Sequence, residues 1–286
     1  MDIIKTNKLK TIINKYLFQN HYTLSRLLLL RLTGFIYFVA YVIILNQFKP
    51  LFGENGLLPA SQFFNRIISY YEGIFPALLK TPSLFLFSST DTFMLVFASI
   101  GLCLSLIFLS GYASGLLLLL NWVIYLSFTY AGQLFYGFGW EMMMLELGFL
   151  SIFLVPFWSF SNSHHHDPPP KVIFFFLQWF LFRVMFDAGL IKLRGDECWQ
   201  TLTCLNTHFE TQPIPNTLSW YFHHLPDPIL KLGVIINHIA ELILPFFIFF
   251  KGRLRFIGIL GMILFQLTLI LSGNLAFLNW LSIIIA

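Results

Sequence analysis

The chain of 286 residues is 57% hydrophobic, only 10% charged, and carries a formal net charge of +4. Soluble domains average about 25% charged residues, and the mean hydropathy here is +0.77. The composition therefore excludes a soluble globular protein, a disordered chain and a basic nucleic-acid binder. It predicts a multi-pass membrane protein, with membrane lipids and no nucleic acid among its partners.

Seven segments are apolar over the length of about 20 residues that a membrane helix needs. They lie near residues 24–45, 90–110, 113–131, 141–160, 172–193, 229–250 and 256–272. The second and third are joined by a tight turn at Ser110-Gly111 or Ser114-Gly115, because Gly and Ser interrupt helices. The sequence predicts an all-α fold, a single transmembrane domain over residues 1–286 with about seven to eight helices.

The last apolar run begins near Phe277 and stops at Ala286. It is too short to span a bilayer. We therefore expect the chain to end inside a helix, as a shortened form of a longer protein would.

The positions of Lys and Arg predict the orientation in the membrane. Residues 1–23 hold several lysines before the first apolar run, which is typical of a basic segment lying on the membrane surface. The Lys and Arg count over alternate connections favours a cytoplasmic N-terminus. Residues 46–89 and 194–228 are then two structured outer loops, and residues 161–171 and 251–255 lie on the other side.

The three cysteines fall in two settings. Cys103 lies within an apolar run, where we expect a small buried hydrophobic side chain. Cys198 and Cys204 lie in the second outer loop, and an oxidising compartment would permit a disulfide between them. Free thiols are the alternative, and a redox or metal role is a third. Because their spacing is not that of a zinc or thioredoxin motif, we expect no metal and no cofactor.

Charged groups inside a bilayer are costly, so each one is a functional candidate. The expected network of buried charges comprises Glu141, Glu146, Arg183, Asp187, His238 and Glu241. Arg183 and Asp187 are four residues apart on one helical face and can pair. His238 and Glu241 are three apart, which favours a hydrogen-bonded pair between helices. The alternative role for His238 and Glu241 is a metal site, which would require a second pair of this kind. We expect the network to be structural, with Glu146 paired to an arginine of another helix.

Lys192 lies near the outer end of the span 172–193. A lysine there usually extends its amine to the interface. The alternative is a desolvated lysine acting as a general base. The phosphate-binding loop, the nucleophile elbow and the His-Glu-x-x-His motif are all absent from the sequence. Apart from the alternative for Lys192, no catalytic residue is expected.

A series of segments in chain order carries a resemblance to a known family. The main ones are Gly53-Glu54-Asn55-Gly56-Leu57-Leu58-Pro59, Phe138-Gly139-Trp140-Glu141, Gly189-Leu190-Ile191-Lys192-Leu193-Arg194-Gly195-Asp196, Trp220-Tyr221-Phe222-His223-His224-Leu225-Pro226 and Asn237-His238-Ile239-Ala240-Glu241-Leu242. Together they resemble the lipase maturation factor family of multi-pass membrane proteins, over about residues 30–282. The sequence departs from the family pattern in two ways. Asp187 stands where a small residue is expected, and the sequence stops before the extramembrane region that family members carry after the last helices.

The resemblance implies a chaperone without a known reaction, so not an enzyme. It would assist secreted lipases of the lipoprotein lipase type to fold and assemble into active dimers. The location it implies is the endoplasmic reticulum membrane, or the cytoplasmic membrane if the source is bacterial. The candidates for contact with a lipase client lie in the second outer loop and are Arg194, Asp196, Trp199, Glu210, His223 and His224.

A shorter segment is similar to a different class. Ala188-Gly189-x-x-Lys192-Leu193, followed by Trp199, looks like a stretch of the vitamin K-dependent gamma-carboxylases. That similarity implies a membrane enzyme that acts on a lipid-soluble substrate with Lys192 as its base. A dry pocket with Lys192 at its wall would favour the enzyme, and a lysine that reaches interfacial water without a cavity would favour the chaperone.

Overall fold

The computed structural model describes residues 22–162, 170–212, 214 and 216–286. The expected surface segment 1–23 thus lies outside the described residues except for its last two. The chain divides into two compact units, Met1–Ile173 and Phe174–Ala286. The fold is all-α, as predicted, and its only strands among the described residues form one short antiparallel pair.

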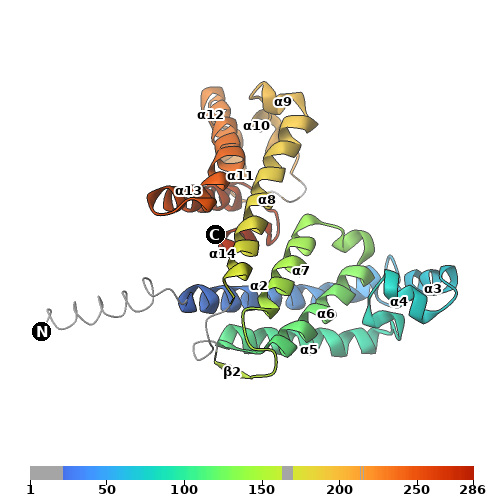
Figure 1. The fold of residues 1–286 in the computed structure, drawn as a ribbon. Helices are drawn as coiled ribbons and strands as arrows, with labels where there is room; N and C mark the ends of the chain where they lie inside the picture. The colour runs from blue at the N-terminus through green and yellow to red at the C-terminus, as the bar shows by residue number, and fades with distance from the viewer. Residues whose placement is uncertain (1–21, 163–169, 213, 215) are drawn as a thin grey trace, which may run out of the picture. The chain divides into compact units, whose positions relative to one another are not determined.

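The first unit is built on four longer helices (Figure 1). In chain order its elements are α2 (Thr23–Phe52), α3 (Ala60–Tyr70), α4 (Ile74–Lys80), η1 (Leu84–Leu86), α5 (Asp91–Ser110), β1 (Tyr112–Ala113), α6 (Gly115–Ala131), η2 (Gln133–Tyr136), α7 (Gly139–Ile152) and β2 (Ser161–Asn162). The helices α2 and α5 lie side by side. A Cβ atom on Gly34 would lie 2.9 Å from the backbone nitrogen of Leu109, so this close approach requires glycine.

The turn predicted after the second span is confirmed. The helix α5 ends at Ser110, and Gly111 follows with a positive φ of 96°. The hydroxyl of Ser114 then accepts a hydrogen bond from the backbone nitrogen of Leu117 and caps the start of α6. Capping of this kind satisfies one of the free N–H groups of the first helical turn.

Five helices of the described residues are long and apolar enough to cross a membrane: Thr23–Phe52, Asp91–Ser110, Lys171–Gly195, Asp227–Phe249 and Arg253–Ser272. The apolar helix α6 has 17 residues. The expected span 141–160 is wrong in its extent, because α7 ends at Ile152. Proline has no backbone N–H and disfavours helix in the residue before it. The backbone oxygens of Pro156 and Phe157 instead accept hydrogen bonds from the start of α6.

Two further features of the first unit concern expectations from the sequence. The helix α2 continues to Phe52 through Pro50, past residue 46, and the bounds of the first loop stay a prediction. Cys103 is exposed rather than buried. Its helix α5 is a membrane span, where lipid is apolar, so an exposed thiol on that helix pays no cost of contact with water.

The second unit surrounds a core of Leu181, Met185, Ala240, Ile248, Met262 and Phe265. Its helices are α8 (Lys171–Gly195), which begins in the first unit, α9 (Glu197–Gln200), α10 (Leu205–His208), α11 (Ser219–His223), α12 (Asp227–His238), η4 (Ile239–Ile243), η5 (Leu244–Phe249), α13 (Arg253–Ser272) and α14 (Leu278–Ile285). The η4 segment is a π-helix that continues α12. The assignment of loops to sides of the membrane and the single domain over 1–286 stay predictions.

Candidate functional site

An ion pair between a part-buried lysine and a buried glutamate joins two helical segments of the second unit. The amine of Lys192, from α8, lies 2.6 Å from Oε1 of Glu241 and 2.7 Å from Oδ1 of Asn237. The amide of Asn237 donates to the other carboxylate oxygen of Glu241 at 3.0 Å. Glu241 is only 3% exposed. Both carboxylate oxygens are therefore satisfied, as a buried charge requires.

Local backbone features bring these side chains together. Glu241 lies in the π-helix Ile239–Ile243, a turn type found frequently at functional sites. Gly189 of α8 faces this turn, and a Cβ atom there would lie 2.6 Å from the side chain of Leu242 and 3.0 Å from that of Glu241. Glycine thus lets α8 approach the π-helix closely enough for Lys192 to reach Glu241.

Trp199 connects the pair to the segment that follows α8. The Lys192 amine lies 5.0 Å from the centre of the Trp199 ring, within the range of a cation–π contact. The backbone oxygen of Trp199 lies 3.0 Å from Nε2 of His238. The neighbouring Cys198 forms a disulfide with Cys204, across a Cα separation of 4.7 Å. Residues 196–204, which follow α8, are therefore held to both α8 and α12.

The disulfide also bears on metal binding. Asp196 lies close to Cys198 and Cys204, a grouping that could hold an ion if both thiols were free. The two sulfurs are joined to each other, and the Asp196 carboxylate accepts a hydrogen bond from the backbone of Cys198 as the cap of α9. All three side chains are thus already bonded within the protein.

Further along the outer segment, the other candidate client contacts form local pairs. Oε1 of Glu210 lies 2.9 Å from Nε2 of His223. Nδ1 of His224 lies 2.7 Å from the backbone oxygen of Trp220. Arg194 and Glu210 are exposed. Burial and the nearby positive charge of Lys192 lower the pKa of His208 below its ordinary value. These residues present polar groups on a segment with a defined conformation.

Two expectations about this site are corrected. Lys192 does not simply extend to the interface, because its amine is bound by Glu241 and Asn237. His238 and Glu241 do not bond to each other: His238 contacts Trp199, and Glu241 contacts Lys192. Spacing along one helix shows which residues share a face, but it does not identify the neighbouring helix that supplies their partners.

The remaining charges of the expected network are placed as follows. Asp187 is exposed on α8, and its pairing with Arg183 stays a prediction. Arg183 is half-buried, with its guanidinium carbon 5.6 Å from the centre of the Phe180 ring. Glu146 is half-buried on α7. The pairing of Glu146 with an arginine stays a prediction.

Glu141 occupies a separate site in the first unit. It is 4% exposed in the first turn of α7, where the helix dipole favours an anion. The hydroxyl of Tyr125 donates to its carboxylate. The Tyr125 ring packs edge-on against Tyr37 and Tyr41 of α2, with ring centres 5.3 and 6.0 Å away. No sequence signal pointed to Tyr125, because a tyrosine within an apolar run is expected to be an ordinary core residue.

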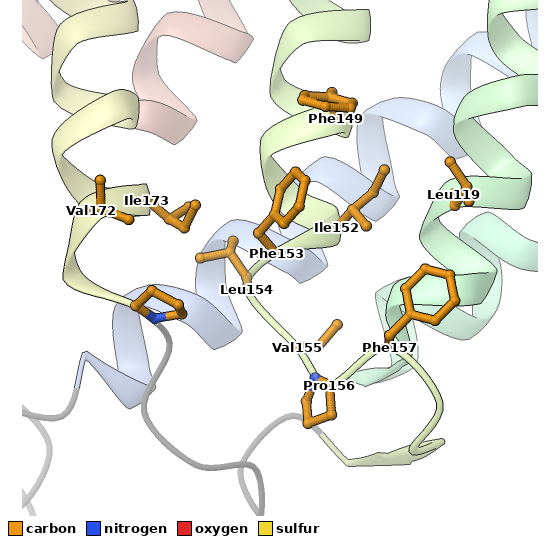
Figure 2. A pocket seen from close by; sticks show the side chains of 11 residues that line it. Leu119, Phe149, Ile152, Phe153, Leu154, Val155, Pro156, Phe157, Val172 and Ile173 are labelled. Atoms are coloured by element: carbon orange, nitrogen blue, oxygen red, sulfur yellow. The ribbon is translucent and has the colours of Figure 1, made fainter.

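One cavity in each unit is defined by the residues that line it. The larger, of about 740 Å³, lies in the first unit and is lined only by apolar residues, among them Leu119, Ile152 and Phe157 (Figure 2). The smaller, of about 180 Å³, lies in the second unit beside Asn216 and Asn279. Lys192 lines neither of them.

Comparison with known proteins identifies the family. Residues 24–286 match the lipase maturation factor transmembrane domain. The chain is 40% identical to Lipase maturation factor 1 of Mus musculus and 39% identical to that of Homo sapiens, over 91% of this chain and 46% and 47% of the relatives. It is 35% identical to Lipase maturation factor 2 of Xenopus laevis, over 87% of this chain and 36% of that relative.

The chain spans less than half the length of these relatives. No solved structure matches it. The match to the transmembrane domain nevertheless covers nearly all of the chain, and five of its helices are suited to crossing a membrane. This chain is therefore a multi-pass membrane protein that belongs to the lipase maturation factor family.

Proposed function

We propose that this chain is the membrane-embedded part of a factor that assists secreted lipases to fold and assemble into active dimers, in the endoplasmic reticulum membrane. The observation that carries the proposal is the match of residues 24–286 to the lipase maturation factor transmembrane domain. The relatives that align over about nine-tenths of the chain bear the same name.

The Lys192 cluster supports a structural role within this function. The Lys192 amine donates hydrogen bonds to the carboxylate of Glu241 and to the carboxamide of Asn237, and these bonds tie α8 to the π-helix. The enzyme alternative, with Lys192 as base, has no supporting observation in this geometry.

The role of the cluster is to hold the outer segment that a client would meet. Trp199 is fixed by Lys192 and His238, and the disulfide closes the loop beside it. A segment fixed in advance loses less conformational entropy on binding. Arg194, Asp196 and Glu210 are exposed on this segment and offer charges of both signs to a client.

Co-expression with a secreted lipase tests the proposal. In cells without their own maturation factor, the chain should raise the specific activity of the secreted lipase and its dimer fraction. The double variant Arg194→Ser/Glu210→Ser should reduce both, because it removes exposed charges from the client-facing segment. Lys251→Ser/Arg255→Ser is the matched control, because it removes an exposed charge just before α13 and a half-buried charge in the first turn of α13. Lipase activity that is the same with and without the chain would refute the proposal.

A further inference from the structure

The smaller cavity has the lining of a site for a polar ligand. It has a volume of about 180 Å³ and lies where α13 ends and the chain turns into α14. The carboxamides of Asn216, Asn274 and Asn279 line it, together with Trp280. A carboxamide offers both donors and acceptors. Since no ionisable side chain lines the cavity, its chemistry suits a neutral ligand that carries several hydroxyl groups.

The walls of this cavity are fixed by hydrogen bonds. The amide of Asn216 donates to the backbone oxygen of Ile270 at 2.8 Å, and its oxygen accepts from the backbone of Leu218 at 3.0 Å. Asn274 accepts from the backbone of Ala276 at 3.1 Å, and Ala276 holds a positive φ of 49°. A left-handed conformation is unusual for alanine. The site is thus largely formed before any ligand enters, as ligand sites usually are.

Two side chains of the wall have unused capacity. Asn279 is 1% exposed, and its Oδ1 has no hydrogen-bond partner among the described residues. A buried acceptor without a donor is costly. Because this oxygen has almost no accessible surface, a ligand hydroxyl reaches it only when the Asn279 side chain turns toward the cavity. Trp280 is 46% exposed and offers a flat apolar face. An amide acceptor beside an indole face suits a ring with hydroxyls at its edge and C–H groups on its face.

We propose that this cavity binds one neutral sugar ring or a similar cyclic polyol. Its volume is below the ~300–1,000 Å³ of sites for drug-sized ligands, so a single ring is the largest group that fits. The same ring chemistry is available from a glycan on a protein or from the headgroup of a glycolipid. The proposal does not depend on the proposed role in lipase maturation.

Saturation-transfer NMR on the whole chain in phosphatidylcholine nanodiscs tests the proposal. Detergents with sugar headgroups must be avoided, because they would fill the site. The probes are methyl glucoside, methyl mannoside, methyl galactoside and myo-inositol, with cyclohexanol as a ring that has a single hydroxyl. A second arm adds glucosylceramide or phosphatidylinositol to the nanodiscs and measures its retention on the protein.

At least one polyol should give a signal in the wild type, and cyclohexanol should give none. Trp280→Leu should weaken that signal about ten-fold, as the loss of one good contact would. Trp158→Leu removes a tryptophan that is 80% exposed and does not line the cavity, so it is the matched control. Asn279→Leu is a second variant that removes the orphan acceptor.

The two arms distinguish the source of the ring. Binding of a soluble glycoside is expected for a protein glycan, and binding only of a lipid-borne ring is expected for a glycolipid. The absence of any signal from all four polyols and both lipids would overturn the proposal and leave a cavity filled by water only. An equal loss of signal in Trp158→Leu and Trp280→Leu would overturn it as well.

Discussion

At the scale of single residues, the account depends on Lys192 and Glu241. Glu241 is buried in the π-helix, and removing its cation would leave a carboxylate without a counter-charge. Breaking a buried pair by removing one partner costs far more than replacing both partners with neutral groups. The two kinds of variant therefore distinguish a structural charge from a catalytic one.

Lys192→Met should destabilise the protein by about 3–5 kcal/mol. The folded yield in size-exclusion chromatography and the thermal unfolding midpoint both measure this loss. The matched control is Lys231→Met, because Lys231 pairs with Asp227 at 2.8 Å but both side chains are about half exposed. Exposed pairs contribute little, so the control should unfold like the wild type. Equal effects of the two variants would contradict the importance of burial.

His208 should make stability depend on pH. Burial and the charge of Lys192 place the folded-state pKa of His208 below 6.5, the ordinary value. As the pH falls below 6.5, the unfolded chain therefore takes up the proton first, and stability declines until the folded-state pKa is passed. His208→Gln should reduce this decline between about pH 7 and pH 5. Thermal unfolding across this range checks it, and a wild-type slope in the variant would contradict it.

At the scale of elements, helix spacing determined much of what could be predicted. The apolar runs located the long helices, and Ser114 marked the start of α6. The end of α7 at Ile152 was missed because the apolar run of the sequence continues through Pro156, whereas the helix does not. The contact between Lys192 and Glu241 was also missed, because it depends on which helices are neighbours. Local sequence specifies an element's length and faces more directly than its partners.

The disulfide between Cys198 and Cys204 constrains the segment that follows α8. Removing it with Cys198→Ser/Cys204→Ser should cost about 2 kcal/mol, because the closed loop is short. The larger effect should be local: the backbone amides from Cys198 to Cys204 should exchange hydrogen faster. Hydrogen-exchange mass spectrometry in native membranes measures it. Two alkylated thiols in the unreduced wild type would show that the bond does not form there.

The packing of α2 on α5 makes a prediction for the first unit. Gly34→Val places a side chain against the backbone nitrogen of Leu109 and the Cβ atom of Phe108, each of which would lie 2.9 Å from a Cβ atom at this position. Overpacking of this kind costs about 1–3 kcal/mol. Gly139→Ala is the control, because nothing lies within 4 Å of its Cβ position. A lower unfolding midpoint is expected only for Gly34→Val, and an unchanged midpoint would refute the close approach.

At the scale of the whole molecule, the orientation in the membrane remains a prediction from the Lys and Arg count. Single cysteines at Gln200 and Lys251, in a chain with Cys103 replaced by serine, test it with an impermeant thiol reagent. Both positions are exposed in the structure. Only Gln200→Cys should react from the outer side. Equal labelling of the two positions would refute the assignment of loops to sides.

The most direct test of the account uses Lys192→Met/Glu241→Gln, which removes both charges together. The variant is co-expressed with a secreted lipase in cells without their own maturation factor, at a folded level matched to the wild type. Because Lys192 acts through structure, the specific activity of the secreted lipase should stay close to the wild-type value. A double variant that folds normally and yields no active lipase would contradict the account and indicate that the Lys192 amine takes part in chemistry.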